Sequence, residues 1–213
     1  PGFVTRVSTD PRTIEKGDTF FALEGPSFNG HDFLGDALEK GAHILVVSRP
    51  EKIPAGWKGR SRTVHVGDTL TAYGDLAAHV RKTWKGPVIA VTGSSGKTTV
   101  KELIAHLLSS RFKVLKNRGT ENNLVGVPKT IFQLDGTHEA MVLEMGTNCP
   151  GEIDRLASIL TPQIGVLTAI GHSHLKGLGS IEGVYREKMR ILHHIERGGI
   201  LILNGEDPML EKA

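Results

Sequence analysis

The sequence predicts an α/β protein with a small N-terminal α/β domain followed by a second domain whose mainly parallel sheet is covered by helices on both faces. From residue 88 onward, short apolar segments alternate with amphipathic ones, which is the pattern of a parallel sheet flanked by helices. A Gly-Pro pair at residues 86–87 follows a helical pattern and separates the two regions. We therefore expect domains at residues 1–85 and 86–213, a length of chain that can bury two cores.

The first region has three predicted elements. Residues 19–25 and 43–49 read as strands, and residues 68–84 read as a helix that Asp68 caps. The apolar residues of this helix recur at helical spacing: Leu70, Tyr73, Leu76, Ala77, Val80 and Trp84.

The second region alternates regularly. We expect strands at 88–93, 113–116, 140–146, 164–170 and 199–205, and helices at 100–110, 126–134, 151–160 and 181–195. Ligands of such sheets lie at the carboxyl ends of the strands. Because the chain starts without Met and ends soon after a strand, we expect a fragment whose second domain is truncated at its C-terminus.

Composition limits the function classes. The 26 basic and 23 acidic residues are interspersed and give a net charge of only +3, so a dedicated nucleic-acid surface is not indicated. Cys149 is the single cysteine of the sequence, which favours a reducing, cytoplasmic setting. No apolar run approaches the roughly 18 residues of a membrane span, and no signal peptide precedes the first expected strand.

The segment from Val91 to Thr99, "VTGSSGKTT", carries the strongest local signal. Gly93 and Gly96 let the backbone curl with its N–H groups inward, and the helix that starts near Lys97 favours an anion. Lys97 would reach the β- and γ-phosphates of a nucleotide, and Thr98 would offer its hydroxyl to Mg²⁺. The usual P-loop fingerprint has Gly where Val91 stands, and the alternative is a strand-to-helix turn that uses Gly and Ser for geometry. The following helix is expected to bury one face: Val100, Leu103, Ile104, Leu107 and Leu108.

Two further side chains follow predicted strands at the same edge of the sheet. Glu144 closes the strand at 140–146 and is a candidate metal carboxylate, the alternative being a solvated strand end. His172 and His174 follow the strand at 164–170, and His174 is the candidate there. A zinc site is not indicated, since no Cys or carboxylate cluster accompanies the pair at ligand spacing.

Lys188 occupies an unusual position in the predicted helix 181–195. At about 100° per residue, it lies in the middle of the apolar stripe formed by Ile181, Val184, Tyr185, Ile191, Leu192 and Ile195. Burial lowers the pKa of a lysine and favours a neutral, reactive amine. The alternative is a side chain whose stem packs while its ammonium reaches water.

Four segments together resemble the Mur ligases of peptidoglycan synthesis: "VTGSSGKTTVKE", "GTENNLVGVPKT", "LEMGTNCPGEI" and "HLKGLGSIEGVYREK". Residues 8–49 are similar to the first domain of the ligases that add the third amino acid and the terminal dipeptide, so the resemblance covers nearly the whole chain. "GSSGKTTVKE" with "NNLVGVP" favours the ligase that adds the dipeptide.

The resemblance implies a role for each matching residue. ATP phosphates would be bound by Thr92, Gly93, Ser94, Ser95, Gly96, Lys97, Thr98 and Thr99, with Asn122 and Asn123 near the γ-phosphate. Mg²⁺ would be held by Thr98, Glu144, His174 and Lys188, the lysine being modified to a carbamate. Lys97, His174 and Lys188 would be the catalytic residues. In the first domain, Ser8, Thr9, Asp10 and Arg12 would lie near the uridine of the substrate, and Ser27, Phe28, Asn29, His31 and Asp32 near its peptide.

The implied reaction is ATP-driven amide formation between UDP-N-acetylmuramoyl-tripeptide and D-alanyl-D-alanine through an acyl phosphate, by a protein expected to be monomeric. "GTENN" replaces a more usual "GNLNN"-like run, and Leu124 stands where an acidic residue often follows the Asn pair. Three alternatives stay open: the ligase that adds the third amino acid, a P-loop kinase or GTPase, although no guanine-reading NKxD is present, and a noncatalytic binding module.

Overall fold

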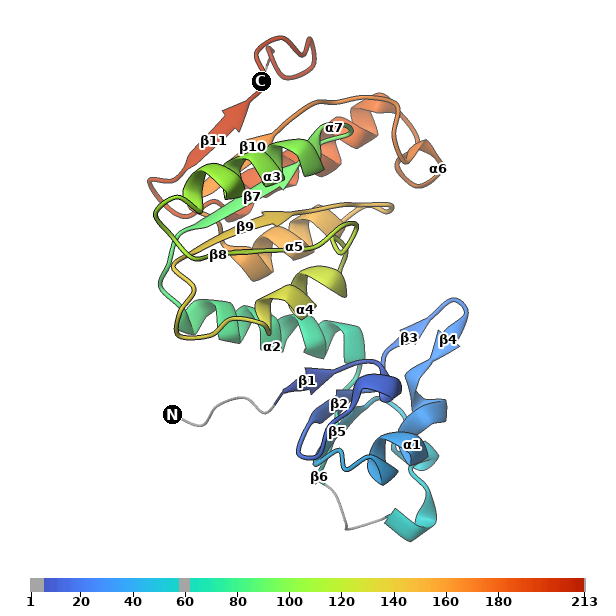
Figure 1. The fold of residues 1–213 in the computed structure, drawn as a ribbon. Coiled ribbons are helices and arrows are strands. Elements are labelled where there is room, and N and C mark those ends of the chain that lie inside the picture. The colour runs from blue at the N-terminus through green and yellow to red at the C-terminus, as the bar shows by residue number, and fades with distance from the viewer. Residues whose placement is uncertain (1–5, 58–61, 213) are drawn as a thin grey trace. The chain divides into compact units, whose positions relative to one another are not determined.

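The computed structural model describes residues 6–57 and 62–212 (Figure 1). The chain divides into two compact units, Pro1–Leu76 and Ala77–Ala213. The division falls within α2 (Thr69–Thr83), because Tyr73 is buried against Phe21 of the first unit and Ala77 belongs to the core of the second. The expected division into a substrate-binding domain at residues 1–85 and an ATP-binding domain at residues 86–213 remains a prediction.

The first unit contains a parallel sheet in the order β1-β2-β5-β6. Its strands are β1 (Val7–Ser8), β2 (Thr19–Phe21), β5 (Ile44–Val47) and β6 (Arg62–His65). One core of this unit gathers strand residues such as Phe20 and Leu45 with Leu34 and Leu38 of α1 (Leu34–Glu39). The expected strand at 43–49 and the helix at 68–84 are present, and the first residues of the expected strand at 19–25 form β2. The amide of Thr71 donates to Asp68 Oδ1 at 2.6 Å, so Asp68 caps α2 as predicted.

The sequence pattern missed several short elements of this unit. The expected strand at 19–25 breaks after β2, and its last two residues form β3 (Glu24–Gly25), which pairs antiparallel with β4 (Phe28–Asn29). The chain bends back so closely that a Cβ on Gly30 would lie 2.8 Å from the backbone of Ala22. Strands of two residues carry too little alternation to be recognised by periodicity.

The second unit contains a five-stranded sheet in the order β11-β10-β7-β9-β8, and each of its neighbouring pairs is parallel. The strands are β7 (Val88–Thr92), β8 (Val114–Lys116), β9 (Ala140–Glu144), β10 (Ile164–Leu167) and β11 (Ile200–Leu203). The helices are α3 (Lys97–Leu108), α4 (Gly126–Ile131), α5 (Glu152–Leu160), α6 (Leu175–Leu178) and α7 (Ile181–Met189). This confirms the predicted parallel sheet.

Helices cover this sheet on both faces, as Figure 1 shows for α3 against α5 and α7. Residues of α4, α5 and α7 bury one face together with the end of α2, and α3 packs on the other face. The face predicted for α3 was partly wrong: Leu103 and Leu107 are 56% and 63% exposed, whereas Lys101 is fully buried. The hydrophobic spacing alone could not reveal that a lysine, with a hydrogen-bond partner inside, takes the position of an apolar residue.

The helix predicted at 181–195 ends at Met189 and continues as a 3-10 helix, Arg190–His194. A 3-10 helix has three residues per turn rather than 3.6, so the apolar stripe changes direction and Leu192 becomes 46% exposed. Lys188 is fully buried, as its place in the stripe predicted. The neighbouring Glu187 is also buried and accepts hydrogen bonds from the amides of Gly151 and Ile153, both at 2.8 Å.

Candidate nucleotide and metal site

The loop between β7 and α3 has the geometry that its glycines allow. Gly93 has φ +152° and passes so close to β10 that a Cβ would lie 2.0 Å from Thr168 Oγ1, and Gly96 has φ +76°. Both positions therefore require glycine. Gly96 leads directly into α3, whose first amides face away from the helix and have no partner within it.

The amide of Ser94 donates to the carbonyl of Ala169 at 2.8 Å. The amides of Ser95, Gly96 and Lys97 donate to no backbone carbonyl of the described residues. Lys97 Nζ donates to the carbonyl of Gly93 at 2.9 Å, across its own loop. Amides at the start of a helix together with a nearby ammonium favour the binding of an anion at this loop.

The remaining residues of the loop play different parts. Thr92 is fully buried at the end of β7, and its hydroxyl has no hydrogen-bond partner among the described residues. Ser94 Oγ accepts from the amide of Gly171 and from Ser173 Oγ, both at 2.9 Å, and so ties the loop to the segment after β10. Thr99 is exposed on the first turn of α3.

Glu144 meets two of the predicted residues at the end of β9. Thr98 Oγ1 donates to Glu144 Oε2 at 2.7 Å, and Asn122 Nδ2 donates to Glu144 Oε1 at 2.8 Å. Glu144 is only 2% exposed, and within the described part of the chain no ion pair involves it. A buried carboxylate without a cationic partner is unfavourable unless a cation is bound. The side chain of Asn123 has a local role, since its Oδ1 accepts from the amides of Val125 and Gly126 at the start of α4.

Lys188 and His174 complete the same region. Lys188 Nζ is buried and has no hydrogen-bond partner among the described residues. Burial first, and then the nearby charge of Lys97, lower the pKa of Lys188 to about 8. Burial, and then the charges of Lys188 and Lys97, lower the pKa of His174. His174 also adopts φ +56°, which is uncommon for a residue other than glycine. Of the three side chains predicted to be catalytic, Lys97 thus lowers the pKa of the other two, and Lys188 lowers that of His174.

The donor set can be compared with what Mg²⁺ prefers. Magnesium is bound by oxygen atoms and usually by one or two carboxylates together with substrate phosphates. The hydroxyl of Thr98 and the carboxylate of Glu144 are adjacent and lie beside the phosphate loop, which fits this preference. No group of three His, Cys, Asp or Glu side chains that could hold a metal occurs in residues 6–57 and 62–212, so protein ligands alone do not form a complete cage there.

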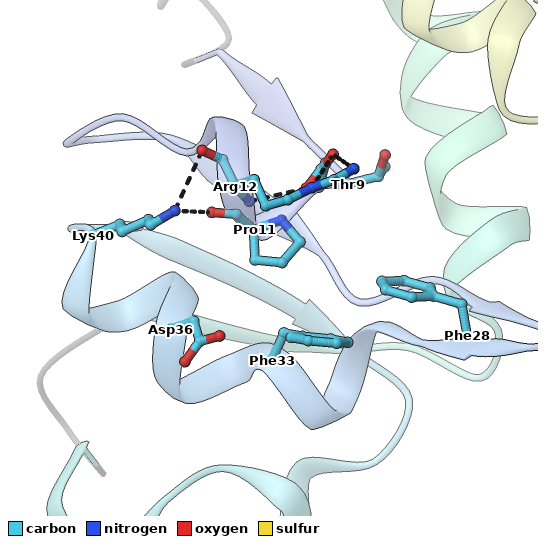
Figure 2. A pocket seen from close by; sticks show the side chains of 8 residues that line it. Thr9, Pro11, Arg12, Phe28, Phe33, Asp36 and Lys40 are labelled. Atoms are coloured by element: carbon cyan, nitrogen blue, oxygen red, sulfur yellow. Dashed lines mark hydrogen bonds and ion pairs between the residues drawn. The ribbon is translucent and has the colours of Figure 1, made fainter.

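A separate pocket of about 530 Å³ lies in the first unit (Figure 2). Three residues named for uridine line it, Thr9, Asp10 and Arg12, together with Phe28. Arg12 is held by Asp10, with Nη2 to Oδ2 at 2.7 Å, and this hydrogen bond lowers the pKa of Asp10 to about 2.

The sequence analysis missed four other residues of this pocket: Pro11, Phe33, Asp36 and Lys40. Phe33 stacks on Phe28 with ring centroids 5.2 Å apart, and Lys40 Nζ donates to the carbonyl of Pro11 at 2.9 Å. Figure 2 shows Thr9 and Arg12 along one side of the pocket and Phe33 and Asp36 along the other. Phe33, Asp36 and Lys40 lie in and around α1, more than 20 residues after Arg12, and no motif in the sequence indicates that they meet it.

The other residues named for the substrate are placed differently. Ser8 is buried and donates to the carbonyl of Asp10 at 2.9 Å. His31 is 2% exposed; its Nε2 accepts from the amide of Ser48 at 3.0 Å, and its Nδ1 lies 2.9 Å from Asn29 Oδ1. Burial lowers the pKa of His31 and favours the neutral ring. Ser27 and Asp32 are exposed and do not line the pocket of Figure 2.

The fold and this loop define a class of protein: a nucleotide-binding α/β protein with a phosphate loop at the carboxyl edge of a parallel sheet. Residues 91–213 match the Mur ligase middle domain, and residues 3–81 match the Mur ligase family catalytic domain. The chain belongs to the Mur ligase family.

Several relatives carry one name, UDP-N-acetylmuramoyl-tripeptide–D-alanyl-D-alanine ligase. The chain is 38% identical to the Bacillus subtilis protein over 207 residues, which are 97% of the chain and 45% of the relative. It is 39% identical to the Escherichia coli protein over 201 residues, which are 94% of the chain and 43% of the relative. The chain thus spans about half the length of the curated relatives it matches.

Solved structures of the same family also match nearly the whole chain. The MurF structure from Acinetobacter baumannii matches with a TM-score of 0.91 and 37% identity, over 98% of this chain and 45% of that one. The MurF ligase from Thermotoga maritima in complex with ADP matches with a TM-score of 0.89 and 33% identity, over 99% of this chain and 48% of that one. None of the helices in the described part of the chain is long and apolar enough to cross a lipid bilayer.

Proposed function

We propose that this chain binds the nucleotide and the uridine-linked substrate in a ligase that joins D-alanyl-D-alanine to UDP-N-acetylmuramoyl-tripeptide with ATP. Three findings support the proposal: the family, the shared name of the relatives, and the geometry of the site. The observation that carries it is the contact between Thr98 and Glu144 beside the loop of Lys97, since a hydroxyl and a carboxylate next to a phosphate loop are suitable ligands for Mg²⁺.

In the proposed reaction, the terminal carboxylate of the tripeptide attacks the γ-phosphate of ATP and gives an acyl phosphate and ADP. The amine of D-alanyl-D-alanine then attacks the acyl carbon and displaces phosphate. No protein nucleophile takes part, so the protein acts by positioning and by stabilising charge. The amides of the loop and Lys97 bind the phosphates, and Asn122 holds the carboxylate of Glu144 in place.

Mg²⁺, when bound, would neutralise charge on the phosphate oxygens, and Thr98, Glu144, His174 and a carboxylated Lys188 would hold it. A neutral buried lysine amine can take up CO₂, and the carbamate that results is an anion where an ammonium would repel the metal. The unpartnered Nζ of Lys188 and its lowered pKa support this role. The pocket of Thr9, Asp10, Arg12 and Phe28 is our candidate for the uridine. We expect the protein to act in the cytoplasm as a monomer.

The test is release of phosphate by the intact protein with ATP, Mg²⁺, UDP-N-acetylmuramoyl-tripeptide and D-alanyl-D-alanine. Phosphate release should require all four, and the product should contain the new amide bond. Release that is independent of the dipeptide would contradict the proposal, and so would tight uridine-nucleotide binding without any turnover, which the noncatalytic module predicts. A second assay, with UDP-N-acetylmuramoyl-dipeptide and the free third amino acid in place of the tripeptide and D-alanyl-D-alanine, distinguishes the ligase that adds the third residue.

A further inference from the structure

Asn117 follows the last residue of β8, is only 1% exposed and forms an unusual pairing with the backbone of Glu144. Its Oδ1 accepts from the amide of Glu144 at 2.9 Å, and its Nδ2 donates to the carbonyl of Glu144 at 3.0 Å. The backbone pairing of β8 with β9 ends at Lys116 and Val142. The side chain of Asn117 therefore extends the strand pairing to Glu144 after the backbone of β8 has turned away.

Lys101 in turn holds the backbone of Asn117. Its Nζ donates to the carbonyl of Asn117 at 2.8 Å and lies 2.9 Å from Glu102 Oε1, although the side chain of Lys101 is fully buried. Burying an ammonium is unfavourable unless its hydrogen bonds are satisfied. An apolar residue would fill the same place on α3 without that penalty, so packing alone does not explain the lysine.

These contacts connect α3 to the carboxylate. Lys101 fixes the main chain of Asn117, Asn117 fixes the main chain of Glu144, and the carboxylate of Glu144 accepts from Thr98 one turn earlier on α3. Asn117 Nδ2 also donates to the carbonyl of Glu121, next to Asn122, at 2.8 Å. One buried amide thus positions both Glu144 and the turn that carries its second donor.

We propose that Asn117 is a positioning residue for the metal-binding carboxylate of Glu144, and that Lys101 supports it. The inference rests on the proposed function, since it assigns Glu144 to a divalent cation. Residues that orient a metal ligand typically change metal affinity by about 10–100-fold when they are mutated. The expected effect is therefore on metal affinity first, and on nucleotide affinity without metal only slightly.

The test compares Asn117→Ala and Lys101→Met with the control Gln163→Ala in the intact protein. Gln163 is a matched control because its Oε1 also accepts from a strand amide, that of Val88, at 2.7 Å, but at the amino end of β7, away from the loop. Lys101→Met keeps an unbranched side chain of similar size and removes both the buried charge and the hydrogen bond to the carbonyl of Asn117. It provides the test if Asn117→Ala folds poorly.

Two readouts do not depend on turnover. Hydrogen exchange of the Glu144 amide, without metal or nucleotide, should be faster in Asn117→Ala and in Lys101→Met than in wild type, and unchanged in Gln163→Ala. Titration of Mn²⁺ into the complex with ADP, followed by electron paramagnetic resonance, should give a dissociation constant about tenfold higher in the two variants. The affinity for ADP without metal should change less than threefold.

The outcomes distinguish the positioning role of Asn117 from the assignment of Glu144 to a divalent cation. If wild type binds Mn²⁺ with ADP and the two variants behave as Gln163→Ala does, the positioning role is refuted while the proposed function stands. If wild type binds ADP but no divalent cation, the assignment of Glu144 fails, and the positioning role fails with it. A loss of Mn²⁺ affinity in both variants but not in the control supports the proposal.

Discussion

Replacement of Lys188 by Met tests whether burial of this lysine lowers its pKa and destabilises the folded protein while the amine is protonated. Its Nζ is buried without a hydrogen-bond partner among the described residues, and burial together with Lys97 lowers its pKa from 10.5 to about 8. At about 1.4 kcal/mol per pH unit, that difference corresponds to roughly 3 kcal/mol of unfolding free energy lost when the lysine is protonated. We expect Lys188→Met to be more stable than wild type by up to this amount at pH 7.

The sign of the pH dependence follows from proton binding. Because the pKa of Lys188 is lower in the folded state, the folded protein binds fewer protons than the unfolded chain between about pH 8 and pH 10.5. The unfolding free energy of wild type therefore rises with pH through that window, whereas the variant lacks this contribution. The excess stability of Lys188→Met should be constant below pH 8 and should disappear near pH 10.5.

The assay is urea unfolding in buffers freed of CO₂, so that the amine stays unmodified. The chain has two tryptophans, and a Trp57→Phe background leaves Trp84, which lies in the second unit, as the fluorescent probe of that unit. The two units need not unfold together, so a probe confined to one of them is required. An excess stability that is the same at pH 7 and pH 11 would refute the reasoning and would favour a lysine whose ammonium reaches water.

Three further changes test the site and its support. Lys97→Ala should abolish acyl-phosphate formation and leave uridine-substrate binding nearly intact, because Lys97 Nζ donates a hydrogen bond to its own loop in the second unit, whereas residues of the first unit line the pocket of Arg12. Ordinary turnover would exclude the nucleotide assignment. Glu187→Ala should destabilise the second unit by about 2–3 kcal/mol, since two amides at the start of α5 lose a charged acceptor. Urea unfolding measures the change, with Glu182→Ala at an exposed position as the control. Equal unfolding midpoints for the two variants would show that water replaces the carboxylate. Arg12→Ala should weaken binding of a uridine nucleotide about tenfold, because one charged hydrogen bond is lost, and should leave the affinity for ADP unchanged. Calorimetric titration measures both affinities. An unchanged affinity for the uridine nucleotide would place the uridine elsewhere.

The parallel sheet and the phosphate loop were predictable because their signals are local. Each strand of the second unit is a short apolar run, and Gly93, Gly96 and Lys97 lie within five consecutive residues of the sequence. The burial of Lys188 was predictable as well, because the two turns of regular helix that precede it, from Ile181, fix its direction. These features need only the few residues around them.

Other features depend on contacts between distant segments. Lys101 is buried because the carbonyl of Asn117, 16 residues later, accepts its hydrogen bond, and no spacing rule contains that partner. The pocket beside Arg12 is completed by Lys40 from the end of α1, an element too short for its periodicity to be recognised. Leu192 is exposed because the helix changes from α to 3-10 geometry before it, and the residue types of the helix do not predict that change.

Lys188 has a consequence for attempts to engineer this protein. A selection for heat resistance alone would favour apolar replacements at position 188, because they remove a buried charge beside Lys97. Active sites often hold groups that lower stability in this way. Thermostable clones altered at this position should therefore be screened for catalysis before they are combined with other substitutions.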